Sequence, residues 1–164
     1  GDLLVVESCE FQRSFLDFQP QCAAILNVEP DHFDCFADEK SLEDAFSDFA
    51  NRVPSSGVIV VSGDSDAAMR CASRSLARLV TFGSRSDCEW QAANIRHTAE
   101  GVHFELHRGG RSLGQIELSQ FGDHNVSNGL AACAVCSELG LSAAEIIASL
   151  RTYPGLRRRF EVIS

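Results

Sequence analysis

Two polar residues near the start of the sequence have side chains that could hold a divalent cation. Glu7 ends an apolar run over residues 3–6, and His32 follows a second apolar run that ends at Val28. Ligands of an open parallel sheet bind beyond the carboxyl ends of its strands, and both residues would lie at that edge. A carboxylate and an imidazole there could hold the ion against phosphate oxygens. Spacing alone leaves an alternative, in which Glu7 and Asp31 cap helices and His32 hydrogen-bonds within its loop.

Two later segments have the composition of a nucleotide site. Asn125 and Asn128 follow Gly122 at the start of an alanine-rich run, where a helix N-terminus would favour an anion. An asparagine amide is both donor and acceptor, so it can recognise an adenine edge, whereas a simple Asx cap would explain only one of the two asparagines. The arginines at residues 157–159 either bind a polyphosphate through their planar charged forks or form a solvated basic patch.

Apolar runs and amphipathic stretches predict the elements that would position these residues. Buried parallel strands are expected at residues 3–7, 22–28, 57–61 and 79–82. Helices are expected at residues 41–53, 65–77, 125–139 and 143–153, the first of them begun by Ser41. Strands that alternate with helices predict an α/β fold, with a mostly parallel sheet and flanking helices.

A small antiparallel hairpin subdomain is predicted after the fourth strand. Residues 102–107 alternate between apolar and polar side chains, and a turn at residues 108–111 leads into a second such run at 116–118. His103 and His107 share the polar face of the first run, but at the rise of a strand they lie ~13 Å apart. They cannot chelate one ion together, so a solvated strand face is the better interpretation.

Composition narrows the classes of partner. The 164 residues carry a net charge of −9, and Lys40 is the only lysine, which argues against a nucleic-acid or anionic-membrane surface. The apolar stretches are far shorter than the ~20 residues of a membrane span. No secretion signal is seen, so we expect a cytoplasmic protein.

The seven cysteines are an odd number without the dense spacing of a disulfide scaffold, and we expect reduced thiols. Cys133 and Cys136 have CxxC spacing, but they sit in the alanine-rich run with no second pair to complete a zinc site. Packing in a core is the preferred interpretation over metal or redox chemistry.

Four separated segments, in this order, together resemble the central ATP-binding domain of the Mur ligases. They are residues 7–16, residues 25–34, residues 122–128 and residues 155–161. The resemblance implies that Glu7 and His32 bind Mg²⁺ and that His124, Asn125 and Asn128 bind the nucleotide. It also implies that Arg159 contacts the nucleotide, so Glu7, His32 and Arg159 would be the catalytic residues.

The resemblance covers residues 1–164 as one domain, with about 155–164 leading toward a C-terminal domain. The phosphate-loop pattern GxxxxGK[ST] does not occur in these residues, so we expect that loop to lie outside them, and the chain alone to be inactive. UDP-N-acetylmuramate and L-alanine would be bound mainly by other domains.

The implied activity is ATP-driven amide formation, in which a substrate carboxylate attacks the γ-phosphate to give an acyl phosphate, and an amine then displaces phosphate from the acyl carbon. Members that add later residues carry a modified lysine after the motif around His32, and Lys40 is too close to His32 to match it. This favours the member that adds L-alanine to UDP-N-acetylmuramate and speaks against folylpolyglutamate synthetase. The alternatives are the recycling ligase that attaches a tripeptide to UDP-N-acetylmuramate and a non-catalytic α/β binding module.

Overall fold

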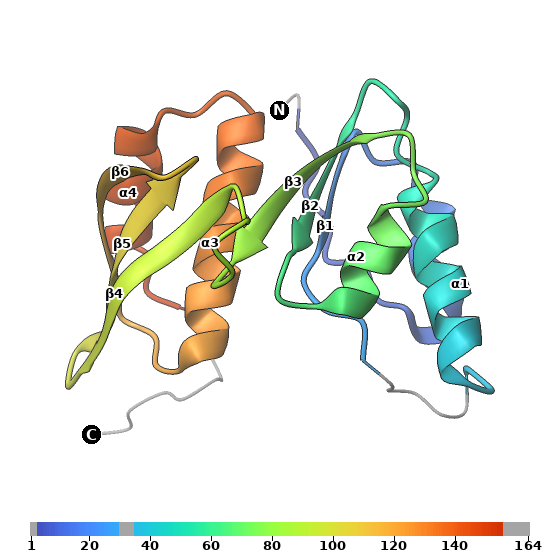
Figure 1. Ribbon diagram of the computed structural model, residues 1–164, viewed down its shortest axis with the longest axis horizontal. Coiled ribbons are helices and arrows are strands. Elements are labelled where there is room, and N and C mark those ends of the chain that lie inside the picture. The colour runs from blue at the N-terminus through green and yellow to red at the C-terminus, as the bar shows by residue number, and fades with distance from the viewer. Residues whose placement is uncertain (1–2, 30–34, 156–164) are drawn as a thin grey trace. The chain divides into compact units, whose positions relative to one another are not determined.

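The computed structural model describes residues 3–29 and 35–155, which contain the strands β1 to β6, numbered in chain order (Figure 1). Helices accompany the strands, so the predicted α/β class is confirmed. The chain divides into two compact units, Gly1–Leu79 and Val80–Ser164.

The first unit is built on two parallel strands. β1 (Cys22–Ile25) pairs with β2 (Val58–Ser62), with Cys22 opposite Val58, and all five residues of β2 are buried. Helices α1 (Glu39–Ala50) and α2 (Asp66–Ala72) pack together beside these strands (Figure 1). Their apolar faces form one core with β1 and β2, which explains why the continuous apolar runs predicted both strands.

The strand predicted at residues 3–7 does not form. Leu3, Leu4 and Val5 are 62%, 83% and 80% exposed, and no strand is assigned to them. β1 is the edge of the sheet and pairs with β2 alone, so residues 3–7 contribute no backbone partner to it. An apolar run becomes a strand only where a neighbour satisfies its backbone groups, and local pattern cannot supply that neighbour.

The two helices of the first unit, α1 and α2, begin and end at other residues than the sequence predicted. α1 is capped by Asp38, whose carboxylate accepts from the Ser41 amide at 2.7 Å, while Ser41 Oγ accepts from the Asp38 amide at 3.3 Å. Ser41 is therefore the third helical residue of a capping box and not the cap itself. α2 ends at Ala72 because Ser73 and Ser75 hydrogen-bond to nearby backbone and end the helix short of residue 77.

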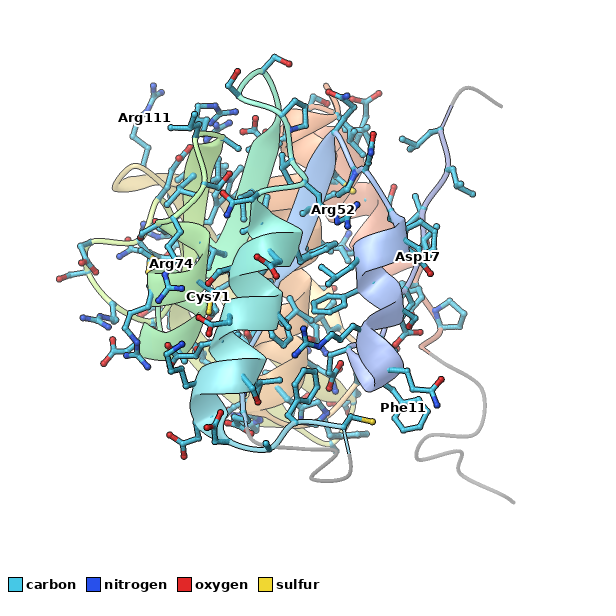
Figure 2. The ribbon with its side chains drawn as sticks, turned by 90° about the vertical axis from the view of Figure 1, so that its right-hand side faces the viewer. Phe11, Asp17, Arg52, Cys71, Arg74 and Arg111 are labelled. Carbon is cyan, nitrogen blue, oxygen red and sulfur yellow. The ribbon has the colours of Figure 1, made fainter. Side chains whose placement is uncertain are left out.

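The segment before β1 contains a short 3₁₀ helix, η1 (Phe11–Asp17), which the sequence did not predict. Gln12 and Arg13 have positive φ angles of 51° and 58°, a conformation that side chains rarely adopt. Phe15 anchors the segment: it is 2% exposed, stacks on Phe49 and meets Phe46 edge-on. Figure 2 shows Phe11 and Asp17 at the two ends of this helix.

The second unit is a mixed sheet with two helices. β3 (Arg78–Gly83) pairs in parallel with β4 (Trp90–Thr98), and β4, β5 (Gly101–Arg108) and β6 (Arg111–Leu118) are antiparallel. α3 (Asp123–Glu138) packs on β4 and β5, and α4 (Ala143–Arg151) packs on β6. The predicted hairpin and both predicted helices are confirmed.

β4 was not predicted, so the subdomain has three antiparallel strands where a hairpin was expected. Its burial pattern shows why: Trp90 is its only buried residue, and exposed and half-buried residues follow one another without alternation. A register shift between Ala93 and Arg96, with Asn94 at a φ of 53°, breaks the period of the strand.

Candidate functional site

The predicted nucleotide residues lie at the N-terminus of α3. Gly122 is the cap residue and has a φ of 93°, and no side chain caps the helix. This φ favours glycine over residues with a side chain, and a Cβ at Gly122 would also approach the His124 ring to 2.9 Å. An α-helix leaves the amides of its first turn without partners inside the helix, although here the Asn125 backbone amide donates to the Gly122 carbonyl at 3.0 Å. Together with the helix dipole, the first turn makes this end of the 16-residue helix suited to an anion.

His124, Asn125 and Asn128 come together here as predicted. His124 and Asn128 are exposed and Asn125 is half-buried. Asn125 and Asn128 share a helix face, because they are one turn apart. The Asn125 amide donates to the Phe121 carbonyl at 2.8 Å and lies 3.0 Å from His124 Nε2, so its orientation is held by neighbours. The alternative of a simple Asx cap is wrong, since neither Asp123 nor Asn125 caps the helix.

His97 is a neighbour of this site that the sequence did not single out. Its Nε2 atom lies 3.1 Å from Asp123 Oδ1, so β4 contributes a side chain to the first turn of α3. Sequence reasoning missed His97 because it did not predict β4, and a histidine in an irregular run carries no signal of its own.

The two predicted metal ligands are not brought together within the described residues. Glu7 is exposed in the segment before η1, and its carboxylate is open to an ion from solvent. His32 lies outside the described residues, as does Arg159. Within residues 3–29 and 35–155, no group of three histidine, cysteine or acidic residues is arranged to hold a metal ion. The exposed Glu7 carboxylate fits a hard cation such as Mg²⁺ by its chemistry, and the metal pair remains a prediction.

Glu7 is followed by a tightly folded turn. The Cys9 carbonyl accepts from Ser14 Oγ at 2.9 Å and from the Phe15 amide at 3.2 Å, and the Glu10 carbonyl accepts from the Arg13 amide at 2.8 Å. Since Phe15 is fixed in the core of the first unit, these bonds tie the chain after Glu7 to that core. Positive φ angles at two non-glycine residues in this turn are a local strain of the kind that clusters at functional sites.

The polar face of the hairpin has a structural role. The Glu105 carboxylate accepts from Ser112 Oγ at 2.5 Å and from Asn94 Nδ2 at 3.0 Å, and His107 Nε2 lies 3.4 Å away. These hydrogen bonds, led by that of Ser112, hold the pKa of Glu105 below its ordinary value. The cluster joins all three strands, which is the function that its contacts serve.

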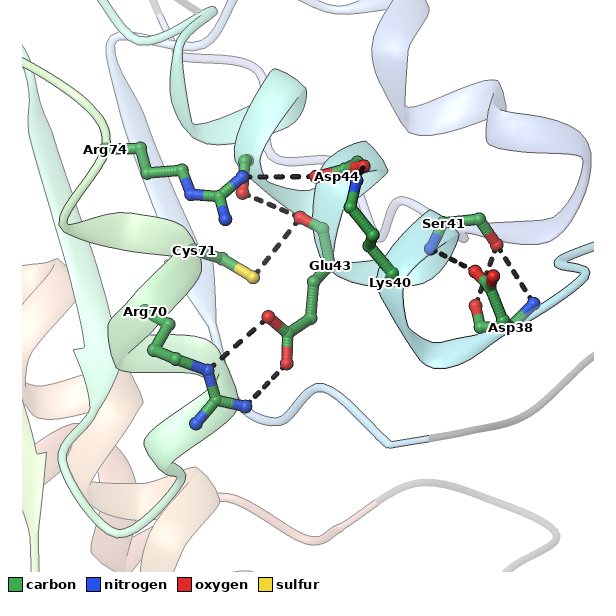
Figure 3. Close-up of polar contacts among 9 residues, drawn as sticks. Asp38, Lys40, Ser41, Glu43, Asp44, Arg70, Cys71 and Arg74 are labelled. Atoms are coloured by element: carbon green, nitrogen blue, oxygen red, sulfur yellow. Dashed lines mark hydrogen bonds and ion pairs between the residues drawn. The ribbon is translucent and has the colours of Figure 1, made fainter.

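A second polar cluster joins α1 to α2 (Figure 3). Arg70 donates to both oxygens of Glu43, at 2.5 Å and 3.4 Å, and Arg74 lies 3.2 Å from Asp44. The hydrogen bond from Arg70 lowers the pKa of Glu43. Figure 2 shows Cys71 and Arg74 on α2, and Cys71 Sγ donates to the Glu43 carbonyl at 3.4 Å. The cluster holds the two helices together.

The CxxC cysteines are part of the packing of α3. Cys133 is fully buried, and burial raises the pKa of its thiol to about 12. Burial also raises the pKa of Cys136. Both thiols are therefore protonated near neutral pH and poor nucleophiles or metal ligands, which supports the packing interpretation.

No helix in the described ranges combines the length and the apolar character needed to cross a membrane.

Residues 2–136 match the family model described as Mur ligase middle domain. The protein of Salinibacter ruber named UDP-N-acetylmuramate--L-alanine ligase is 37% identical over 161 residues, which cover 98% of this chain and 34% of that protein. The protein of the same name from Desulfitobacterium hafniense is 35% identical, over 99% of this chain and 36% of its own length. The chain therefore spans about a third of the length of the curated relatives it matches.

Solved structures match the fold over most of the chain. MurF from Acinetobacter baumannii superposes with a TM-score of 0.81 at 25% identity, over 93% of this chain and 33% of that one. A UDP-N-acetylmuramate:L-alanyl-gamma-D-glutamyl-meso-diaminopimelate ligase from Neisseria meningitides gives 0.76 at 26% identity, over 88% and 44%. MurC from Thermotoga maritima gives 0.77 at 21% identity, over 92% and 33%, which shows the fold alone.

Proposed function

The chain belongs to the Mur ligase family through its middle domain, and from this premise we propose that it is the ATP-binding domain of a ligase that joins L-alanine to UDP-N-acetylmuramate. The observation that carries the proposal is the identity of 35% to 37%, over nearly the whole chain, to proteins named for that reaction. The wider function is a step in the synthesis of peptidoglycan, the bacterial cell wall.

In the proposed reaction, a substrate carboxylate takes the γ-phosphoryl group of ATP, which forms an acyl phosphate and releases ADP. The amine of L-alanine then attacks the acyl carbon, so that the amide bond forms and phosphate leaves. Phosphoryl transfer depends on positioning and electrostatics more than on a protein nucleophile. We therefore assign no covalent role to the cysteines. Glu7 and His32 would hold Mg²⁺, and Arg159 would offset charge on the phosphates.

The N-terminus of α3 supports the nucleotide part of this proposal. Asn128 is exposed, and Asn125 is oriented by the Phe121 carbonyl, so one amide is free and the other is pre-positioned. A donor and acceptor pair on one helix face can meet the edge of adenine. The first-turn amides and His124 would add donors toward the same ligand. With ATP as substrate, we also propose a cytoplasmic location.

The runner-up is the ligase that recycles a tripeptide onto UDP-N-acetylmuramate. Its structural counterpart from Neisseria meningitides shares the fold and 26% identity, so the fold does not separate the two activities. The acceptor of the acyl group separates them: an amino acid in one case and a peptide amine in the other.

The deciding experiment is phosphate release by the whole protein that contains this chain, with ATP, magnesium and UDP-N-acetylmuramate. L-alanine, glycine, L-serine and the tripeptide are compared as acceptors. Turnover with L-alanine supports the proposal, and turnover with the tripeptide alone selects the runner-up. If none of the four acceptors gives phosphate release, both proposals are overturned and a non-catalytic binding module remains.

The metal assignment is tested in the same assay with Glu7→Gln and His32→Ala. Each variant should lower kcat by about 100-fold or more and raise the magnesium concentration needed for half-maximal rate, because a charge-stabilising ligand is lost. Glu100→Gln is the matched control, since Glu100 is an exposed acid in the turn before β5. Unchanged magnesium dependence in both site variants would refute the assignment.

The 164-residue chain alone should bind Mg-ATP weakly and release no phosphate, because the GxxxxGK[ST] pattern does not occur in it. Calorimetry with Mg-ATP tests this expectation. Tight, magnesium-dependent binding by the chain alone would contradict it.

A further inference from the structure

The first residue of α3 is acidic and lies at the helix end that the proposed function assigns to the nucleotide. Asp123 opens the helix, and its side chain is 89% exposed. A negative side chain in the first turn is favourable to the helix dipole, but it repels an anion that binds at the same place. The direction of this carboxylate therefore matters for the binding of ATP.

His97, on β4, holds that carboxylate. Its Nε2 atom lies 3.1 Å from Asp123 Oδ1, and because a carboxylate is an acceptor, the ring nitrogen is the donor of this contact. The contact joins two segments that are far apart in the sequence. It gives the Asp123 side chain a partner on β4, outside the first turn of α3.

The sheet fixes the place of His97 relative to α3. His97 lies opposite Val102 of β5, so the two side chains share a face of the sheet, and Val102 is fully buried. α3 covers this face closely, since a Cβ at Gly129 would approach Leu118 Cδ1 to 3.2 Å and the Phe104 ring to 3.6 Å. Because α3 packs on both β4 and β5 (Figure 1), His97 and the first turn of the helix are held on one framework.

The contact contributes little to the stability of the fold. The His97 and Asp123 side chains are 51% and 89% exposed, and pairs at such exposure have small energies because water competes for both groups. We propose that His97 is a positioning residue for ATP, which keeps the Asp123 carboxylate on the β4 side and leaves the first-turn amides of α3 open to a phosphate-bearing ligand. This inference rests on the proposed function.

Without His97, the Asp123 side chain is free to turn toward the N-terminal amides of α3. It would then compete with the ligand for these donors and repel its negative charge. The penalty acts on the charge of the ligand, so adenosine, which shares the base and ribose of ATP but has no phosphate, should be unaffected. Salt should reduce the penalty, because exposed charges are screened within about 10 Å at about 0.1 M ionic strength and within about 3 Å at about 1 M. A merely structural role would weaken both ligands at any salt concentration.

The test uses the whole protein and measures the Kd of a fluorescent ATP analogue, the Kd of adenosine as its competitor and the urea midpoint of unfolding. His97→Ala should weaken binding of the analogue about fivefold at about 0.1 M salt and less at about 1 M, and it should leave adenosine and the midpoint unchanged. The double variant His97→Ala with Asp123→Asn should restore the wild-type Kd, because the asparagine carries no charge. His97→Gln keeps a donor and should bind the analogue nearly as well as the wild type.

His103→Ala is the matched control. His103 lies opposite Arg96 and directly precedes Phe104, so it is on the other face of the sheet from His97 and α3. Its removal should change neither Kd.

An unchanged Kd of the analogue in His97→Ala overturns the inference, as does an equal loss for adenosine or a double variant that binds as weakly as His97→Ala. A wild-type protein that does not bind the analogue overturns the nucleotide assignment, and the inference with it. Binding without phosphate release in the presence of L-alanine overturns the proposed function alone, because the Kd values still decide the role of His97.

Discussion

Replacement of Phe15 by alanine should be among the most damaging single changes in the first unit. The ring is 2% exposed, its centroid lies 5.0 Å from that of Phe49 and 5.2 Å from that of Phe46, and no other residue of η1 is buried. Loss of a buried phenyl ring costs about 3 to 5 kcal/mol through lost transfer energy and the cavity left behind. The two ring pairs, at about 0.5 to 1.5 kcal/mol each beyond area, place the change in the upper part of that range.

The assay is urea unfolding of the 164-residue chain followed by circular dichroism. At a slope of about 2 kcal/mol/M, Phe15→Ala should lower the midpoint by about 2 M. Phe15→Leu keeps most of the apolar volume and should lose less than half as much. Phe18→Ala is the control, because Phe18 is 40% exposed in the same segment and should cost about 1 kcal/mol or less. A Phe15→Ala midpoint equal to that of the control would refute the anchoring role.

Three further predictions concern charge, backbone and thiols. The hydrogen bond from Arg70 lowers the pKa of Glu43 in the folded protein. The contact between Glu43 and Arg70 therefore stabilises the fold at pH values above the ordinary pKa of 4.5, and this stabilisation is lost as the pH falls through the folded-state pKa. Glu43→Gln should therefore cost about 0.5 kcal/mol in urea melts at pH 7 and progressively less as the pH falls below 4.5, and a cost that does not shrink with falling pH would contradict this prediction. Gly101→Ala, with a φ of 142° and a Cβ 1.9 Å from a β6 carbonyl oxygen, should cost more than about 2 kcal/mol in the same melts. Gly109→Ala, with a φ of 55° and open space around it, should cost only about 1 kcal/mol, and equal costs would count against the steric reasoning. A thiol reagent with mass detection should label exposed Cys9 within minutes and Cys133 only after unfolding, and early labelling of Cys133 would show that it is not packed as described.

The elements that were predicted well are those whose pattern is local and complete. β2 is apolar from Val58 to Val61 because it is buried on both faces, and the hairpin of β5 and β6 alternates around two glycines. β4 carries no such pattern, because one end is buried, the middle is half-covered and a bulge shifts its register. Residues 3–7 have the composition of a strand, but whether they pair is decided by neighbours that no local pattern describes.

In the candidate site, too, the residues that follow a local sequence pattern could be predicted, and those that depend on distant contacts could not. The glycine and two asparagines at the start of α3 were recognisable because a helix start has its own residue preferences. His97 was not, since its place beside the first turn of α3 depends on a contact between segments far apart in the sequence. The metal pair Glu7 and His32, and the nucleotide contact of Arg159, stay predictions.

The strand order of the second unit has a consequence for how the protein folds. β4, β5 and β6 each pair with the strand next to them in the sequence, and only Gly109 and Gly110 separate β5 from β6. Contacts of such short range close small loops, and they form faster than parallel pairings that must wait for a distant segment. During synthesis this sheet can be completed as soon as β6 leaves the ribosome, before either helix that packs on it has been made.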